Sequence, residues 1–439
     1  MSNLANVTRR TLLKGAAVAA LGAPYIIQSS ALGLGDRPAP SNRLGIANIG
    51  TGGQGGGHVK GLLEEKDVQV MAICDVDSRR RDEKKKWVEE RYTRDAPGTY
   101  AGCATCGDFR EVLARPDVDA VLIAAPDHWH ALISTMAAKA GKDIYCEKPM
   151  AARIGEGRAA ADTVKRYGRI FQTGSQERSG GSRFAWELIR NGYLGKLHTI
   201  RTYLPMEAHC LAPQGDASPQ PVPEGFDYDT WLGPAPMAPY TEKRCHFNFR
   251  WILDYSDGEL TDRGAHVNDI ALWVAQPFLK SPVEIVATEG KFRDDSLWDV
   301  PIHFHLEYTY ANGLKIICES SGQRGIKFEG EKGWIFSAIH GGFLTAEPAS
   351  LLKTVLGPKD VQLGRSKGHR RDWLDAVKTR GDTVAPAEDG HRTASFCHLG
   401  IIALQTGRKL TWDLEKEQFI NDSDANSYVT RPMRAPWHL

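Results

Sequence analysis

The stretch that decides the fold is RLGIANIGTGGQG, residues 43–55. Its apolar half ends at Ile49, and the glycine-rich turn that follows leads into a segment of helical character that extends to about Glu65. In this order of strand, turn and helix, the first glycine permits a tight turn. The second glycine lets backbone N–H groups approach a pyrophosphate, and the last lets the helix lie close to the strand. The sequence therefore predicts a dinucleotide site formed by Gly50, Gly52, Gly53, Gln54 and Gly55.

A second buried strand is expected from Val68 to Cys74, and Asp75 stands at its end. A carboxylate at that place can accept hydrogen bonds from the adenosine ribose hydroxyls, and it repels a 2′-phosphate. This favours NAD over NADP. Arg79 and Arg80 follow closely and could offset the repulsion, so NADP stays open.

Strands and helices continue to alternate, with strands expected at 120–125 and 143–146 and a helix at 131–140. This alternation predicts a parallel, doubly wound sheet of the Rossmann type. Its ligand should lie at the carboxyl ends of the strands, where the chain places Gly50, Asp75, Pro126 and Glu147.

The second half of the chain has a different pattern. Residues 281–291, 302–310, 313–320 and 325–328 read as successive strands, with turn signals such as Ala311-Asn312-Gly313 between them. Residues 211–223 hold four prolines and are expected to form a loop or lid.

The N-terminus has the layout of a twin-arginine signal peptide over residues 1–35. The segment TRRTLLK, residues 8–14, precedes a small apolar run that ends at Ile27, and Ser29-Ser30-Ala31 resembles a cleavage site. We therefore expect export by the twin-arginine machinery to the periplasm or medium, after folding and with a cofactor in place. The alternative is a disordered basic tail with an apolar helix. We expect no membrane span in the mature protein.

Charge and cysteine content exclude some functions. The formal net charge is +1, and residues 1–35 carry three of the basic residues and no acid, so a nucleic-acid surface is not expected. The eight cysteines are too sparse for a disulfide framework. Cys103 and Cys106 have the spacing of a redox or metal pair, but no second pair accompanies them, so a structural role is expected.

Three separated signatures resemble the Gfo/Idh/MocA family of oxidoreductases, which is named for glucose–fructose oxidoreductase and inositol dehydrogenase. The first is the turn at 50–55 together with Asp75. The second is APDHWH at 125–130 followed by EKP at 147–149, and the third is DRGAH at 262–266. The likeness covers essentially everything after residue 42, and the ending RPMRAPW, residues 431–437, looks like the secreted bacterial, sugar-associated branch.

The resemblance implies an NAD(P)-binding Rossmann domain at 42–165 and a substrate-binding α/β domain at 166–439. The second domain would carry a large, open, mostly antiparallel sheet, and its C-terminal segment could pack back on the first domain. A small sugar or glycoside substrate, a tightly bound cofactor and a homo-oligomer are also implied.

Oxidation of a secondary alcohol needs a base for the hydroxyl proton and a cation or donor beside the developing alkoxide. In the family pattern these roles match Lys148, Asp262 and His266. The spacing does not decide whether Lys148 or His266 is the base. A histidine of this kind is expected to titrate near the operating pH. Lys148 as a surface lysine, His266 as a core histidine, and metal ligation by Asp262, His266 and Asp269 are the alternatives; no metal is expected.

Further residues are expected around this chemistry. Pro126, His130, Glu147 and Gln176 should border the cofactor, where Lys148 also belongs. Arg178, Arg250, Trp251 and Asp269 are the candidates for contact with substrate, although aromatic residues in such places are often only packing.

The leading interpretation is thus an NAD(P)-dependent oxidoreductase that acts on a CH–OH group of a sugar or polyol. The alternative is an NAD-dependent glycosidase that works by transient oxidation, elimination and re-reduction. A non-catalytic sugar-binding protein on the same fold is disfavoured by the presence of both Lys148 and His266.

Overall fold

The computed structural model describes residues 37–95, 102–294 and 297–439, so the predicted signal peptide lies outside the described residues. The first part of the chain forms a six-stranded parallel sheet in the order β3-β2-β1-β4-β5-β6, which confirms the predicted Rossmann sheet. Its elements are β1 (Leu44–Ile49), α2 (Gly53–Leu63), β2 (Val68–Cys74), α3 (Ser78–Asp95), β3 (Ala104–Cys106), α4 (Phe109–Leu113), β4 (Ala120–Ile123), α5 (Asp127–Lys139), β5 (Asp143–Cys146), α6 (Ile154–Arg166) and β6 (Phe171–Thr173). Strands β4 and β5 are buried along their whole length, because helices cover both faces of the sheet.

The second part forms a nine-stranded sheet in the order β13-β12-β11-β7-β10-β9-β8-β14-β15. Only β7 and β10 run parallel, so the expected mostly antiparallel sheet is confirmed. Its strands are β7 (Leu197–Tyr203), β8 (Val283–Phe292), β9 (Pro301–Tyr310), β10 (Lys315–Glu319), β11 (Gly325–Gly330), β12 (Gly333–Ala338), β13 (Leu344–Glu347), β14 (Leu410–Asp413) and β15 (Gln418–Phe419).

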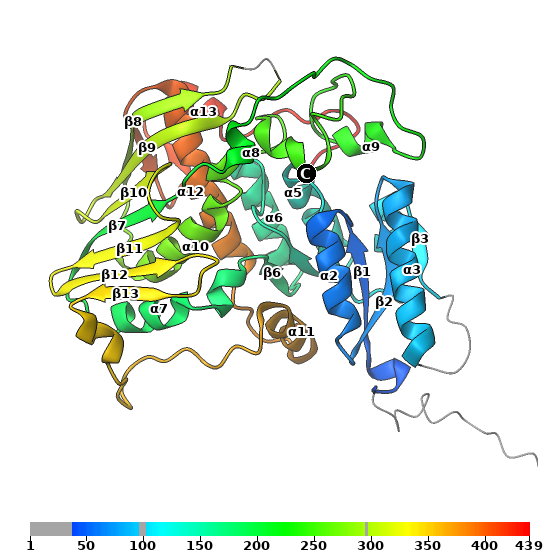
Figure 1. Ribbon diagram of the computed structural model, residues 1–439, viewed down its shortest axis with the longest axis horizontal. Helices are drawn as coiled ribbons and strands as arrows, with labels where there is room; N and C mark the ends of the chain where they lie inside the picture. Colours follow the sequence, from blue (N-terminus) through cyan, green and yellow to red (C-terminus); the bar gives the residue numbers. More distant parts are fainter. Residues whose placement is uncertain (1–36, 96–101, 295–296) are drawn as a thin grey trace, which may run out of the picture.

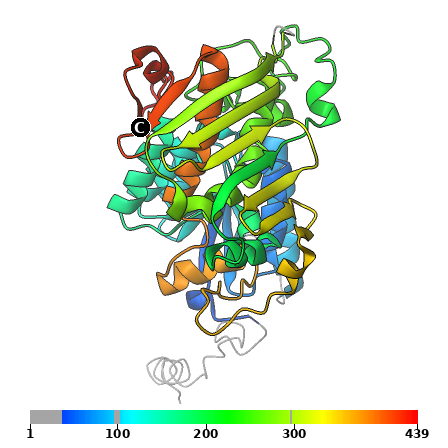
Figure 2. The same ribbon diagram turned by 90° about the vertical axis from the view of Figure 1, so that its left-hand side faces the viewer.

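Helices cover one face of this second sheet. Alternate residues of β9, such as Phe304, Leu306 and Tyr308, are buried in one core together with residues of α10 (Gly264–Ala275) and α12 (Ala387–Thr406). This is the period-two burial expected of a sheet that packs on one side. Figure 2 shows the other face of the sheet, in front of the helices. The remaining helical elements are η1 (Pro40–Asn42), η2 (Gln176–Ser179), α7 (Ser182–Arg190), α8 (Ala208–Leu211), α9 (Tyr228–Leu232), η3 (His246–Trp251), η4 (Gly258–Leu260), η5 (Gln276–Phe278), η6 (Ala349–Lys353), α11 (His369–Thr379) and α13 (Ser423–Ser427).

The two parts are interleaved along the chain. Strand β6 lies beyond residue 165, where the sequence predicts the domain boundary, and still belongs to the first sheet. Trp373 of α11 is buried in the core of the first part, and the Trp437 ring lies 4.8 Å from that of Trp129 on α5. Late segments of the chain therefore complete the packing of the dinucleotide-binding half.

A bridging segment, residues 205–252, follows β7 and runs from the second sheet across to the first (Figure 1, green). There the Ser78 N–H donates to the Gly225 carbonyl at 2.9 Å, and Asp77 forms an isolated bridge with Phe226. The proline-rich stretch at 211–223 lies inside this segment and, apart from the end of α8, contains no helix or strand. Within the described residues, no helix is long and apolar enough to cross a membrane.

Candidate active site

A cavity of about 720 Å³ lies between the two parts of the molecule. One wall is formed by the loops after β1, β2, β4 and β5, which is the edge where the sequence predicts a ligand. The opposite wall comes from the bridging segment and from the start of α10, with Arg250, Asp262 and His266. Residues that are far apart in the chain thus face one space.

The glycine turn has the geometry that a pyrophosphate requires. Gly50 has a φ of +81°, and a Cβ there would lie 2.6 Å from the backbone of Ala124 and Ala125. A Cβ at Gly55 would lie 2.0 Å from the Gly50 carbonyl oxygen, so the turn tolerates no side chain at either position. Helix α2 begins at Gly53 without a side-chain cap, and its first N–H groups border the cavity. This uncapped N-terminus fits an anionic diphosphate.

Asp75, which is expected to accept hydrogen bonds from the adenosine ribose, lines the cavity, and its carboxylate already has hydrogen-bond partners within the protein. One carboxylate oxygen accepts from the Thr51 N–H at 2.7 Å, and the other accepts from the Asp77 N–H at 2.9 Å. Asp75 therefore also holds the glycine turn. Asp77 and Arg80 line the same end of the cavity, and Arg80 hydrogen-bonds Nδ1 of His246 at 2.7 Å. The sequence analysis singled out neither Asp77 nor His246. His246 could not be found from the local sequence, because the bridging segment brings it to this end of the cavity.

Glu147 organises the middle of the cavity. Its carboxylate accepts from Gln54 and Gln176 at 2.9 Å each, and it pairs with His58 at 2.7 Å. Burial disfavours the charged carboxylate, but the hydrogen bond and charge of His58 hold the pKa of Glu147 well below its usual value. The three residues placed here from the sequence, Gln54, Glu147 and Gln176, all line the cavity, whereas His58 was not predicted.

Lys148 and Asp262 meet across the cavity although 114 positions separate them. The Lys148 ammonium donates to the Asp262 carboxylate at 2.5 Å and to its backbone carbonyl at 3.0 Å. Arg250 lies 3.3 Å from the same carboxylate. Burial opposes ionisation of Asp262, yet Lys148 and Arg250 lower its pKa well below the usual range. Asp262 precedes α10 rather than lying within it.

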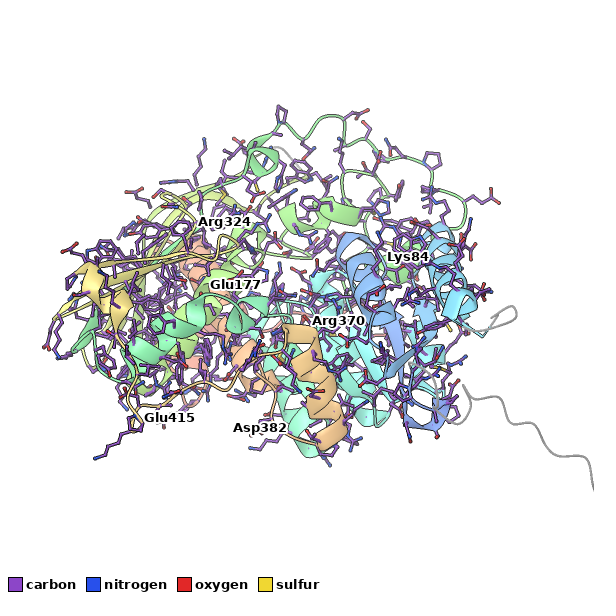
Figure 3. The ribbon with its side chains drawn as sticks, turned by 60° about the horizontal axis from the view of Figure 1, so that its bottom comes forward. Lys84, Glu177, Arg324, Arg370, Asp382 and Glu415 are labelled. Atoms are coloured by element: carbon purple, nitrogen blue, oxygen red, sulfur yellow. The ribbon has the colours of Figure 1, made fainter. Side chains whose placement is uncertain are left out.

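His266, in the first turn of α10, is neutral in this setting. Burial and then the charge of Lys148 lower its pKa to about 3, so the expectation that it titrates near the operating pH is wrong. Its Nδ1 is buried without a hydrogen-bond partner in the protein. Because buried polar atoms are nearly always hydrogen-bonded, this nitrogen is a candidate for contact with a ligand. The His340 ring lies 4.9 Å away, on the turn after β12. His340 has a φ of 62°, a left-handed conformation that is uncommon for a non-glycine residue. Its N–H donates to Glu177, which Figure 3 labels.

Three residues expected at the substrate lie elsewhere. Arg178 and Asp269 form a bidentate ion pair at 2.7 and 2.8 Å, and both are almost fully buried outside the cavity. Asp389 also accepts a hydrogen bond from Arg178, so the charge of the guanidinium is already balanced by two carboxylates. Trp251 is 1% exposed and packs among aromatic residues. Arg178 and Asp269 are occupied by each other and by partners on α12, and Trp251 is occupied by an aromatic cluster; the local sequence reveals neither set of partners.

Pro126 and His130 line the cavity as expected. Pro126 precedes the first residue of α5. Both ring nitrogens of His130 face carbonyl oxygens, those of Pro149 at 2.6 Å and Ala125 at 2.8 Å. The ring therefore ties together the two loops that carry the family-like signatures. All eight cysteines are buried and unpaired, in line with their expected structural role.

The fold and the cavity define a dinucleotide-binding oxidoreductase. Family models describe the same architecture: an NAD-binding Rossmann fold matches residues 44–175, and the C-terminal α/β domain of the same oxidoreductase family matches residues 210–439. The chain belongs to the Gfo/Idh/MocA family of oxidoreductases.

Individual relatives are more distant. A glycosyl hydrolase family 109 protein of Shewanella pealeana is 28% identical over 205 residues, which is 44% of this chain and 44% of that protein. The chain thus matches less than half the length of this curated relative. Levoglucosan dehydrogenase, solved with NADH and levoglucosan, superposes with a TM-score of 0.60 at 18% identity, over 84% of this chain and 99% of that one. The aldose-aldose oxidoreductase from Caulobacter crescentus gives a TM-score of 0.58 at 18% identity over the same shares. At such identities these structures show a common fold.

Proposed function

We propose that this protein oxidises a secondary alcohol of a sugar or polyol with NAD(P) as the hydride acceptor. The observation that carries the proposal is the convergence of Lys148 with Asp262 and His266 in the cavity that begins at the glycine turn. A bound nicotinamide dinucleotide supplies the acceptor. The chain's own part is to hold a hydroxyl, to remove its proton and to stabilise negative charge on its oxygen.

The roles follow from charge and burial. Lys148, held against Asp262, provides a fixed cation for the hydroxyl oxygen. His266 is neutral and has a free ring nitrogen, so it can accept the hydroxyl proton. Arg250, beside Asp262, is placed to contact neighbouring hydroxyls.

Single-turnover reduction of protein-bound NAD(P) by a panel of sugars tests this activity. The purified protein should gain reduced-nicotinamide absorbance with a responsive sugar and no cleavage product. If no sugar, polyol or glycoside changes the redox state of the cofactor, the proposal fails.

A second candidate is the NAD-dependent glycosidase. The observation in its favour is His340: transient oxidation, elimination and re-reduction need a second group that transfers protons, and this imidazole faces His266. The glycosyl hydrolase family 109 relatives point the same way. Release of the aglycone from a glycoside without net cofactor reduction would favour this reading over a simple dehydrogenase.

We also propose that the cofactor is NAD and is tightly held. Asp75 and Asp77 place two carboxylates at the adenosine end, which disfavours a 2′-phosphate, although Arg80 lies beside them. The bridging segment closes over this end through Gly225 and Phe226. Mass spectrometry of the nucleotide released on denaturation checks both points, because NADP, or no nucleotide at all, would contradict them.

Export is the last part of the proposal. The twin arginines, Arg9 and Arg10, precede the short apolar run that ends at Ile27. Replacing both by lysine should leave the protein in the cytoplasm, as seen by fractionation of cells. Unchanged periplasmic delivery of that variant would contradict the assignment.

We also propose a homo-oligomer that forms through the face of the second sheet opposite its helices (Figure 2). Sedimentation equilibrium gives the mass directly, and a monomer at all concentrations would exclude it.

A further inference from the structure

Three side chains with metal-binding atoms gather behind the cavity wall that carries Arg250, Asp262 and His266, which we call the substrate wall. His209 and Cys210 lie on α8, and Glu259 lies on η4. One donor atom from each of the three lies within 4.8 Å of the other two. None of the three has a role in the proposed chemistry.

Two of the three side chains are buried, and two of the polar atoms in the cluster have no hydrogen-bond partner. Cys210 is 2% exposed and Glu259 1% exposed, while His209 lies on the solvent side. The thiol donates to one oxygen of Glu259 at 2.9 Å, but the other oxygen is buried with no hydrogen bond. Among the described residues, no lysine or arginine forms an ion pair with Glu259.

A carboxylate from outside the cluster lies beside the histidine ring. Its Nδ1 lies 3.3 Å from the Glu207 carboxylate, and its Nε2 is buried without a partner. Glu207 is itself fixed by Arg263 at 3.1 Å and by Arg324 (labelled in Figure 3). Metal-bound histidines usually have a carboxylate or carbonyl beside one ring nitrogen, while the other nitrogen binds the metal.

We propose that His209, Cys210 and Glu259 bind a divalent transition metal of the zinc type. Imidazole, thiolate and carboxylate are donors that Zn²⁺ accepts together, and three protein ligands leave a fourth position for water. The thiolate and the carboxylate would balance the charge of the ion. Ligands of a tetrahedral site stand roughly 3.5 Å apart, so the sulfur and oxygen need to separate by only about half an ångström.

Such an ion would join α8 to η4 behind the wall of the cavity. The His209 ring lies 5.2 Å from the ring of Phe247, which lines the cavity, and Glu259 shortly precedes Asp262. The metal would therefore stabilise the position of the substrate wall without taking part in hydride transfer. This inference does not depend on which sugar reaction the protein catalyses.

The test is metal binding to the full chain after treatment with a chelator. The protein is titrated with Zn²⁺ and separately with Co²⁺, and metal content per chain is measured together with the near-ultraviolet absorption of a cobalt–thiolate bond. Wild-type protein should bind about one equivalent with that absorption. Cys210→Ser should lose the absorption and Glu259→Gln should lose retention of the metal.

Cys245→Ser is the matched control, because Cys245 is buried in the same aromatic cluster as Cys210 but, among the described residues, belongs to no group of metal-binding side chains. It should bind as the wild type does. Glu259→Gln keeps the shape of the side chain, so it remains informative if Cys210→Ser fails to fold. Absence of cobalt–thiolate absorption in the wild type, or equal metal retention in all variants, would overturn the site and leave a hydrogen-bonded thiol–carboxyl pair.

Discussion

The ion pair between Lys148 and Asp262 holds a cation in the cavity. Asp262 fixes the Lys148 ammonium by two contacts, and the ammonium adds to burial, the larger cause, in lowering the pKa of His266. In the proposed reaction the Lys148 ammonium therefore has two effects. It stabilises negative charge on a substrate oxygen, and it helps to keep the His266 imidazole neutral, so that this ring can accept a proton.

Lys148→Met tests the first effect. The variant should retain the dinucleotide, because other groups form the glycine turn, but its rate of cofactor reduction should fall by about 10²–10³. Rapid-mixing absorbance measures that rate. Lys139→Met, which changes an exposed lysine at the end of α5, should behave as the wild type. A near-normal rate in Lys148→Met would return Lys148 to a structural role.

The second effect predicts a change in titration. Burial and Lys148 hold the pKa of His266 at about 3, so in the wild type this residue stays neutral from pH 8 down to pH 5 and causes no loss of activity there. Without the ammonium, the pKa should rise, although burial, the larger cause, continues to hold it below its ordinary value, and the neutral form should begin to be lost at a higher pH than in the wild type. NMR of the imidazole resonances follows this directly. A wild-type His266 that titrates near 6.5 would contradict the inference.

At the scale of elements, the strand–turn–helix unit of β1 and α2 depends on how closely its parts approach. Gly55→Ala places a methyl group 2.0 Å from the Gly50 carbonyl oxygen. The turn must then open, and we expect loss of the dinucleotide.

Gly57→Ala on the same helix is the control, since a Cβ there meets nothing within 4 Å. It should keep the cofactor and raise the free energy of unfolding by about 0.5–1 kcal/mol, the usual gain of alanine over glycine inside a helix. Fluorescence titration with NAD and urea unfolding measure the two quantities. Equal cofactor affinity in both variants would show that the close approach is unimportant.

Elements of the first sheet were predicted well, for a physical reason. The strands expected at Val68–Cys74 and Asp143–Cys146 have those bounds in the structure. Strands buried on both faces are short continuous apolar runs between turn residues, and such runs stand out in a sequence. In the second sheet the expected strand 281–291 is observed as Val283–Phe292, but its neighbours in space could not be inferred. In particular, β7 lies between β10 and β11, which are more than 100 residues later in the chain.

At the scale of the whole molecule, the buried pair of Arg178 and Asp269 ties η2 to α10, and Asp389 extends it to α12. Asp269→Asn would leave Arg178 only partly neutralised. We expect the free energy of unfolding to fall by about 3 kcal/mol, at the low end for a broken buried pair because Asp389 remains.

Denaturant unfolding measures this loss. Asp117→Asn, which breaks an exposed pair with Arg115, should change the free energy of unfolding by less than about 1 kcal/mol. The cofactor should stay bound in both variants under native conditions. If Asp269→Asn has normal stability but loses turnover, Asp269 belongs to the substrate after all.

The sequence by itself determined the dinucleotide turn and the parallel sheet, and its short motifs singled out Lys148, Asp262 and His266 as the candidates for the proposed chemistry. Each of these rests on neighbouring residues, because a turn, a buried strand or a short motif is encoded locally. Only the tertiary structure decided which charges are already satisfied: it paired Arg178 with Asp269, gave Asp75 to the glycine turn, and brought His246 and His340 to the cavity. A side chain's partner, and with it the side chain's charge and availability, depends on segments that pack together from distant parts of the chain.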